Sequence, residues 1–461
     1  MSKPNILFFF TDDQRFDTLG GLGHPIVKTP VIDALMARGT TFTQAHVAGG
    51  TVGAICMPSR AMLHTGRTLF HLDGSGQRIP RGDTMLGEHL QAQGYRSFGT
   101  GKWHNGREAY ARSFTDGAEI FFGGMDDHWN VPAYDFDPTG EYAGTLPQCP
   151  QAFTSNEVKI RGGDHVSAGK HSSELFADAT IDFIEQHDSD APFFAYLSFM
   201  APHDPRTMPA EYLAMYDPEE MPLPENFMGG HPFDNGDLKV RDEILADFPR
   251  DPWETRRHIA EYYAMITHLD AQVGRVLAAL EASGKADDTI IVFAGDNGLA
   301  LGQHGLFGKQ NCYEHSVRVP LIIAGPGMPE GARRDDYAYL LDIYPSLCDL
   351  LGIEMPASVE GQSLVEGGAP GRETLFTAYR DVQRMVKDGR YKLIEYVVEG
   401  RRTTQLFDLQ EDPLEMNNLA EDPAQGQRLA GLREMLRQYR DDWDDRATEW
   451  GQAFWDGYEA G

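Results

Sequence analysis

The sequence predicts an α/β protein: an α/β/α sandwich around a large, mostly parallel sheet, with a smaller C-terminal α+β subdomain that contains an antiparallel sheet. Two observations predict this fold. Short apolar runs that end in polar residues alternate with segments of helical periodicity. Beyond about residue 365 the pattern changes to neighbouring strand-like runs and one amphipathic helix. We therefore expect a large domain at 1–365 and the subdomain at 366–461, within the two or three domains that 461 residues allow.

Four apolar runs are expected to form buried strands of the large sheet. The first, Ile6–Phe10, contains no polar residue and ends in Thr-Asp-Asp, which is typical of a parallel strand covered on both faces. The others are Phe193–Phe199, which ends in Ala-Pro-His-Asp-Pro; Thr289–Ala294, which ends in Gly-Asp-Asn-Gly; and Val319–Ile323, which ends near Gly-Pro-Gly. Because ligands bind outside the carboxyl ends of parallel strands, we expect these polar tips to lie along one rim.

Helices are expected between these strands, because apolar residues recur there every three to four positions. The segments with this pattern are Thr29–Arg38, Thr84–Gln93, Ser172–His187, Arg256–Ser283 and Asp342–Leu351. In the subdomain, strands are expected at Tyr391–Val398 and Gln405–Leu409, joined by a hairpin at Glu399–Arg402, and a helix at Arg428–Trp443.

Two long stretches, 105–170 and 204–255, lack clear periodicity. Both are rich in Gly, Pro, Asp and aromatic residues. Long irregular insertions in a compact domain are usually lids or substrate walls, so these stretches are expected to shape a binding site.

Composition excludes several classes of partner. The 40 Lys and Arg against 70 Asp and Glu give a net charge of −30, which argues against non-specific binding to nucleic acid or to an anionic membrane. No apolar run approaches the length of a membrane span, and the N-terminus lacks the features of a signal peptide, so we expect a cytoplasmic protein without a membrane segment. Four cysteines without a CxxC pair favour a reducing compartment and at most one reactive cysteine: Cys56, Cys149, Cys312 and Cys348.

Polar residues at two of the strand tips have the character of a cation site, and a third tip carries a histidine. Asp12 and Asp13 are adjacent, and two such carboxylates repel each other unless a cation lies between them. Asp296 and Asn297 add a carboxylate and an amide oxygen, and an all-oxygen set suits Ca²⁺ or Mg²⁺ rather than zinc. His203 follows another apolar run and is expected at the same rim. Taken singly, each tip also fits a helix cap or a solvated turn.

The segment Cys56–Arg67 has the sequence Cys-Met-Pro-Ser-Arg-Ala-Met-Leu-His-Thr-Gly-Arg. It resembles the signature of the formylglycine-dependent sulfatases, Cys-x-Pro-Ser-Arg followed by Thr-Gly-Arg. One departure is His64, where the family usually has an aliphatic residue. The resemblance spans the chain through Asp12-Asp13, Gly101-Lys102-Trp103-His104, Pro202-His203, Gly295-Asp296-Asn297-Gly298, Gly302-Gln303-His304-Gly305 with Lys309, Asp408-Leu409 and Asp412-Pro413.

This resemblance implies a fold like that of alkaline phosphatase and a modified cysteine. Cys56 would be oxidised to formylglycine (3-oxoalanine) by a formylglycine-generating enzyme, which reads Pro58 and Arg60. The family favours Ca²⁺, with Mg²⁺ left open by the oxygen ligands alone. The expected ligands are Asp12, Asp13, Asp296, Asn297 and the modified position 56.

An aldehyde at position 56 makes chemical sense in an ester hydrolase. It hydrates to a geminal diol, one hydroxyl of which attacks sulfur, while the second lets a base expel sulfate and restore the aldehyde. Lys102 and Lys309 are expected to stabilise charge on the transferring group, and Arg60 to fix the diol and the cation ligands.

Two histidines are candidates for proton transfer. His203 is the expected general acid for the leaving group, aided by Lys309, and His104 is the expected base. The candidate substrate contacts are His304, Arg206 and Arg380.

The resulting hypothesis is a sulfatase that hydrolyses a sulfated mono- or oligosaccharide, with an aryl or small alkyl sulfate second. A phosphonate monoester or phosphodiester hydrolase is the alternative on the same site, because those esters are also tetrahedral and singly charged. A binding protein without turnover and a two-zinc phosphatase agree less well with the residues present. The sequence leaves open the sulfated position, endo or exo action, and the oligomeric state.

Overall fold

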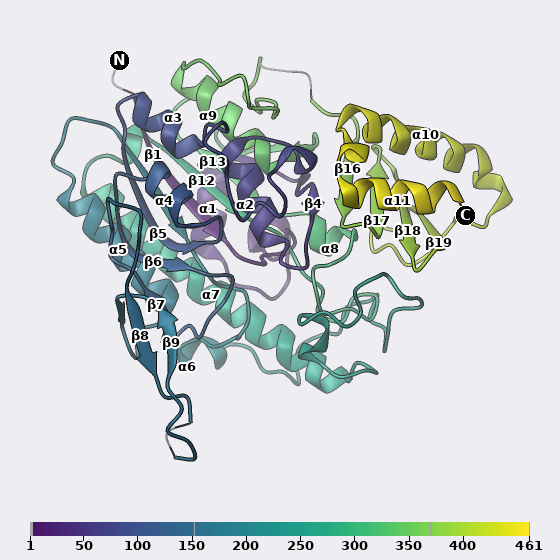
Figure 1. Cartoon of the computed structure of the whole chain (residues 1–461), viewed down its shortest axis with the longest axis horizontal. Coiled ribbons are helices and arrows are strands. Elements are labelled where there is room, and N and C mark those ends of the chain that lie inside the picture. Colours follow the sequence, from purple (N-terminus) through teal and green to yellow (C-terminus); the bar gives the residue numbers. More distant parts are fainter. Residues whose placement is uncertain (1–2, 152, 368–370, 461) are drawn as a thin grey trace.

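The computed structural model describes residues 3–151, 153–367 and 371–460. Its centre is an eight-stranded sheet with the order β14-β2-β13-β12-β1-β11-β5-β6 (Figure 1). Neighbours are parallel except at β13, which is antiparallel to both β12 and β2, so the predicted α/β class with a mostly parallel sheet is confirmed. In the same order the strands span Ala332–Arg334, Gly39–Phe42, Leu321–Ala324, Thr289–Gly295, Asn5–Thr11, Phe193–Ser198, Arg96–Trp103 and Asp116–Phe122.

The register of β1 brings three strand ends to one rim. In the parallel pairing with β12, Thr11 is opposite Gly295, and in the pairing with β11, Phe10 is opposite Ser198. The segments that follow these three strands therefore leave the sheet side by side, which is the arrangement predicted for the polar tips.

The prediction that the fourth strand tip lies at this rim is wrong. The run Val319–Ile323 corresponds to β13, which lies in the opposite direction to β12, so its carboxyl end is at the other edge of the sheet. Gly325, just after β13, packs against Thr289 at the start of β12. An apolar run predicts burial of a strand but carries no information on its direction.

Helices cover both faces of this sheet. Leu7 and Phe9 of β1 belong to one core with α1, α5 and α7, whereas Ile6, Phe8 and Phe10 belong to another with α2, α3, α4 and α9. The strand is thus buried on both sides, and the sandwich is confirmed. The helices are α1 Pro30–Ala37, α2 Cys56–Thr65, α3 Leu86–Ala92, α4 Arg107–Ser113, α5 Ser172–Gln186, α6 Ala210–Leu213, α7 Pro252–Ala282, α8 Glu314–Val317 and α9 Ile343–Leu351.

The C-terminal part forms a second sheet, with the order β19-β18-β17-β16-β4 (Figure 1). Its strands β16 to β19 are antiparallel, and the helices α10 and α11 pack on it. The hairpin turn is at Glu399 and Gly400, so Arg401 and Arg402 already belong to β19. The bounds are β16 Leu375–Tyr379, β17 Gln383–Lys387, β18 Tyr391–Val398, β19 Arg401–Asp408, α10 Gly426–Asp442 and α11 Glu449–Ala460.

The fifth strand of this sheet, β4, comes from the N-terminal part of the chain. It comprises Gly49–Gly50 and pairs in parallel with β16. The second sheet is therefore completed by the segment that leads into α2, and the boundary between residues 365 and 366 stays a prediction.

Most of both aperiodic stretches is loop, but the first also contains α4 and β6, which belong to the sandwich and were not predicted. The first contains a hairpin, β8–β9, that projects from the body of the molecule (Figure 1). No helix in the described residues is both long and apolar enough to cross a membrane. The remaining short strands are β3 Ala45–His46, β7 Pro132–Ala133, β8 Thr145–Gln148, β9 Lys159–Gly162, β10 His165–Val166 and β15 Ala338–Tyr339, and the 3-10 helices are Gly20–Leu22, Leu69–His71, Glu243–Leu245, Ala286–Asp288, Leu340–Asp342, Pro423–Gln425 and Asp445–Ala447.

Candidate active site

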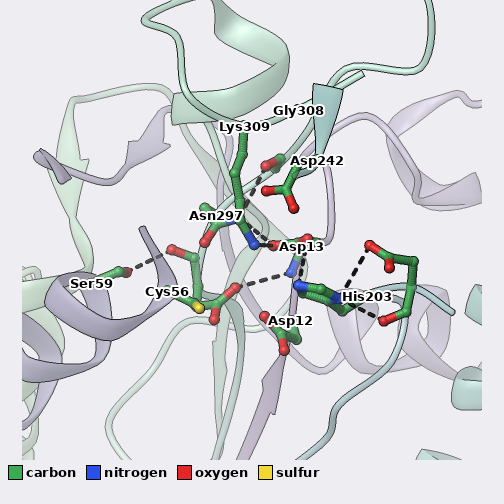
Figure 2. A network of polar contacts seen from close by, with 12 residues as sticks. Asp12, Asp13, Cys56, Ser59, His203, Asp242, Asn297, Gly308 and Lys309 are labelled. Carbon is green, nitrogen blue, oxygen red and sulfur yellow. Dashed lines mark hydrogen bonds and ion pairs between the residues drawn. The ribbon is translucent and has the colours of Figure 1, made fainter. Parts of the chain in front are cut away.

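The rim gathers ten of the predicted site residues into one buried cluster, part of which Figure 2 shows. Loops after β1, β11 and β12 supply acidic, amide and histidine side chains, β5 supplies a lysine, and α2 begins at the motif cysteine. Its members are Asp12, Asp13, Cys56, Arg60, Lys102, His104, His203, Asp296, Asn297 and Lys309.

Cys56 lies at the centre of this cluster. Its Sγ is 3.4 Å from the Lys102 Nζ and 3.4 Å from the His104 Nδ1, and the residue is 2% exposed. Burial raises the pKa of the Cys56 thiol, and the nearby charges of Lys102 and Lys309 offset this only in part. The unmodified thiol is thus protonated at neutral pH and a weak nucleophile.

Arg60 connects α2 to the strands beneath it. It lies one turn after the cysteine, so both side chains point from the same face of the helix. Its Nε donates to the Asp296 Oδ2 at 2.9 Å, and one terminal nitrogen donates to the Ser198 Oγ at 2.6 Å. The guanidinium also lies over the Phe10 ring. A buried, multiply bonded arginine of this kind fixes the position of the helix start.

The cluster has the donor set of a hard-cation site. Ligand atoms of Asp12, Cys56 and Asp296 lie within 4.8 Å of one another. Within the described chain, the buried Asp12 Oδ1 and Asn297 Oδ1 have no hydrogen-bond partner. A buried oxygen without a partner is costly, so these atoms fit coordination of Ca²⁺ or Mg²⁺. Burial, together with the charge of Asp12, raises the pKa of Asp296, a repulsion that a cation would relieve.

Asp13 occupies the sharp turn that follows β1. Its φ of 63° is in the left-handed region, which is unusual for a residue with a side chain. One carboxylate oxygen accepts hydrogen bonds from the Lys309 Nζ and the Asn297 Nδ2, both at 2.6 Å. Lys102 pairs in the same way with Asp12. Each catalytic lysine candidate is therefore bonded to one of the two adjacent carboxylates.

The two histidines differ in their surroundings. Burial lowers the pKa of His104 well below its usual value, and the charges of Lys102 and Arg60 lower it further, so the ring is neutral and able to accept a proton at neutral pH. The His203 Nδ1 donates to the backbone carbonyl of Asp204 at 2.7 Å. Its Nε2 consequently faces the site, 3.6 Å from an Asp13 oxygen.

Within the described residues, none of the three predicted substrate contacts forms a hydrogen bond or ion pair with the cluster. One terminal nitrogen of Arg206 contacts the His258 Nδ1 at 2.7 Å, and His304 stacks on Tyr313 with ring centroids 3.9 Å apart. Arg380 forms an ion pair with Asp237 at 3.0 Å. Their roles stay predictions.

His64 packs beneath the motif helix as an aromatic residue. Its ring lies 4.5 Å from that of Trp103 and 5.0 Å from that of Tyr196, measured between centroids. Neither ring nitrogen has a hydrogen-bond partner among the residues described. Burial and the neighbouring charge of Arg60 lower the pKa of His64 to about 3, so it is neutral in the folded protein.

Sequence reasoning missed several residues around the cluster. Ser198 holds Arg60, Asp204 bonds His203, and Asp242 lies beside Lys309 (Figure 2). Asp204 directly follows His203, so its place beside the histidine could have been predicted from the sequence. Asp242 lies inside an aperiodic stretch, where no pattern indicated its place.

Cys56 and the paired carboxylates thus lie together at the carboxyl rim of a mostly parallel sheet, an arrangement suited to the hydrolysis of an ester. The chain belongs to the sulfatase family: a sequence model described as "Sulfatase" matches residues 4–353. A second model, described as "N-sulphoglucosamine sulphohydrolase, C-terminal", matches residues 302–442. The predicted family and the predicted sulfuric ester hydrolase class are confirmed.

Similar proteins include sulfatases and one related hydrolase. An arylsulfatase of Clostridium perfringens is 29% identical, over 94% of each chain. A structure solved in complex with its substrate D-glucosamine-2-N,6-O-disulfate is 22% identical, with a TM-score of 0.74 over 98% of this chain and 99% of the other. The phosphonate monoester hydrolase of Agrobacterium radiobacter is 23% identical, with a TM-score of 0.72 over 96% of each chain. The two structures support the fold.

Proposed function

We propose that this sulfatase hydrolyses the sulfate ester of a mono- or oligosaccharide, with formylglycine at position 56 and one bound divalent cation, Ca²⁺ in the first instance. The observation that carries the proposal is the place of Cys56: the motif cysteine is in contact with both Lys102 and His104, and its sulfur lies within 4.8 Å of carboxylate oxygens of Asp12 and Asp296. Asp12, Asp13, Asp296 and Asn297 would hold the cation together with position 56.

Formylglycine and the cation would supply different chemistry. When present, the hydrated aldehyde provides a hydroxyl for attack and a second for release, and the cation provides positive charge for the sulfate oxygens. Around them, Lys102 and Lys309 place two buried positive charges that neutralise charge on the transferring group. Arg60 keeps the start of α2, and so position 56, at a fixed distance from Asp296.

Proton transfer is divided between the histidines. His203 presents Nε2 to the site while its Nδ1 is bonded to a backbone carbonyl, so a proton on Nε2 is directed toward the leaving oxygen. His104 is neutral and lies 3.4 Å from position 56, which suits the removal of a proton there. The carboxylates, the lysines and the histidines thus have separate tasks.

A saccharide is the favoured substrate. The two aperiodic stretches are long enough to form polar and aromatic walls around the rim. A structure with the same fold was solved with a disulfated glucosamine as its substrate, which supports this class. The arylsulfatase relative supports an aryl sulfate as the next choice.

A phosphonate monoester or phosphodiester hydrolase is the second candidate. It is favoured by the likeness in fold to the phosphonate monoester hydrolase. Sulfate monoesters and these esters share a tetrahedral centre with one negative charge, so the same cluster suits both.

Two measurements test the proposal. The mass of the tryptic peptide Gly39–Arg60, from protein made in its own host, reports the modification: we expect a mass lowered by conversion of the thiol to the aldehyde. An unmodified thiol in a preparation that hydrolyses sulfate esters would contradict the formylglycine mechanism.

The second measurement compares a sulfate, a phosphonate and a phosphodiester with one aryl leaving group, followed by sulfated saccharides. We expect the sulfate ester to give the highest kcat/KM among the aryl esters. A sulfate ester slower than the others by orders of magnitude would overturn the assignment in favour of the second candidate.

A further inference from the structure

The loop that carries Lys309 has no regular secondary structure, yet its side chain must be placed beside Asp13. Three consecutive backbone N–H groups in this loop donate to side-chain oxygens. Those of Phe307 and Gly308 donate to the two carboxylate oxygens of Glu243, at 2.9 and 2.8 Å. That of Lys309 donates to the Gln310 Oε1 at 2.9 Å. Side chains therefore supply the acceptors for the backbone N–H groups at and before Lys309, where no helix or strand does so.

Glu243 itself is held from the opposite side. It lies in the second aperiodic stretch and is 2% exposed. Arg250 forms an ion pair with its carboxylate and donates to its backbone carbonyl at 2.7 Å. The Arg250 Nε also donates to the Gly305 carbonyl at 2.9 Å, on the loop of Lys309. The carboxyl group is thus buried, paired with an arginine and aimed at two N–H groups, which is a directional arrangement.

Gln310 ties the same loop to the segment before the motif cysteine. Its Nε2 donates to the Gly53 carbonyl at 2.8 Å and to the Asp242 Oδ2 at 2.7 Å. The amide of Gln310 consequently connects three segments: the loop of Lys309, the segment before α2 and the second aperiodic stretch. Figure 2 shows Asp242 and Gly308 next to Lys309.

Gly308 is where these side chains come closest to the loop. A Cβ added at this position would lie 2.9 Å from the Glu243 Oε1 and closer still to the Gln310 Oε1. The absence of a side chain at Gly308 is therefore what lets Glu243 reach the backbone.

We propose that Glu243 is a positioning residue for Lys309: by binding the N–H groups of Phe307 and Gly308 it sets where the ammonium group meets the ester, and so how well charge on the leaving group is stabilised. The inference rests on the proposed function, in which Lys309 acts on the transferring group and aids the leaving group. The second aperiodic stretch, which was expected to form a wall of the binding site, would thus also position a catalytic side chain.

The test is a double-mutant cycle on aryl sulfates with leaving groups of different pKa. In Glu243→Gln, one amide oxygen replaces two carboxylate oxygens, so one N–H loses its acceptor and the loop shifts. We expect kcat to fall roughly 10- to 100-fold with KM little changed, and to fall most for the poorest leaving groups. Lys309→Ala should show the same dependence on the leaving group, and the double variant should be no slower than Lys309→Ala alone.

The control is Asp445→Asn, which removes the buried carboxylate that accepts from the Nε of Arg384, on β17 of the second sheet, at 2.6 Å. We expect it to lower the melting temperature without changing the dependence on the leaving group. If Glu243→Gln does not fold, Gly308→Ala displaces the same contacts and should give the same kinetic pattern.

Two outcomes would overturn the proposal: an equal loss for all leaving groups, or losses that multiply in the double variant. Failure of the proposed function is separate. If the wild-type enzyme prefers phosphonate esters, the same cycle is run on those, and the coupling of Glu243 to Lys309 is still measured.

Discussion

Two regions of this protein each bury several charged side chains, but the partners of these side chains differ between the regions. At the rim, Asp12 Oδ1, Asn297 Oδ1 and one terminal nitrogen of Arg60 have no hydrogen-bond partner in the described part of the chain. Between α8 and the second sheet lies a buried cluster that we call the charge clamp: Glu314, Lys387, Lys392 and Glu415. There, each charged group has at least one partner of opposite charge.

The clamp is closed by ion pairs within the chain: its one oxygen without a hydrogen bond in the described residues, the Glu415 Oε1, lies 2.7 Å from the Lys392 Nζ, whereas the Asp12 Oδ1 at the rim is 4.0 Å from the nearest arginine nitrogen. The Lys387 Nζ donates to both carboxylate oxygens of Glu314 at 3.0 Å, and Lys392 lies 3.1 Å from Glu314 and 2.7 Å from Glu415. It joins the large sheet region to the second sheet. In the proposed function a cation would satisfy the polar atoms of the rim, whereas the charges of the clamp are satisfied by one another. The comparison teaches that partnering, and not burial, separates a site from a structural charge cluster.

The largest expected effect is at the rim. Cys56→Ala should reduce sulfate ester turnover by more than about 1,000-fold, because the reacting group itself is removed. Its melting temperature should stay close to that of the wild-type protein, since the replaced thiol is small. Initial rates and thermal unfolding check both points. Retained activity would contradict the assigned nucleophile.

The clamp should show the reverse pattern. Lys392→Met leaves Glu415 buried without its lysine and should lower the free energy of unfolding by about 3–5 kcal/mol, with kcat of the folded enzyme unchanged. Denaturant unfolding measures the loss. The matched variant Lys392→Met/Glu415→Leu removes both charges and should recover most of it. A double variant as unstable as the single one would show that the pair is not the source of the loss.

A cation should stabilise the rim and leave the clamp unaffected. At 100 times its Kd, Ca²⁺ is expected to raise the free energy of unfolding by about 2.7 kcal/mol, because it binds the folded state. Thermal unfolding with and without Ca²⁺ gives this increment. It should vanish in Asp296→Asn and persist in Lys392→Met. An increment that is absent in the wild-type protein, with Mg²⁺ as well as Ca²⁺, would contradict the cation site.

The smallest effect concerns His64, whose ring nitrogens lack partners within the described residues. His64→Leu should stabilise the protein by about 1 kcal/mol at pH 8, because it removes buried polar atoms. The pKa of His64 is about 3 in the folded state and near its ordinary value when unfolded, so below pH 6.5 the unfolded state binds the extra proton. Wild-type stability is thus lost as the pH falls, and the advantage of the leucine should be larger at pH 5.5 than at pH 8. An advantage that does not change with pH would contradict the buried neutral ring.

The sequence was sufficient for β1, β11 and β12 and for the grouping of the rim residues, but β5, which carries Lys102, was not predicted. Apolar runs with polar ends are local features, and β1, β11 and β12 are read from them directly. The direction of β13 was not predictable in this way. The partners of Glu243 lie in a different loop, and Arg380 is paired with Asp237 from an aperiodic stretch. Such contacts depend on tertiary packing between segments that carry no periodic pattern.

The pairing of β4 with β16 sets an order of events during synthesis. Gly49 is opposite Ala378, so the segment before the motif cannot find its place in the sheet until the ribosome has made most of the chain. In the finished protein Cys56, Pro58 and Arg60 are all buried. If Cys56 is modified as proposed, an enzyme that reads Pro58 and Arg60 must therefore act after the motif leaves the ribosome and before β4 pairs with β16.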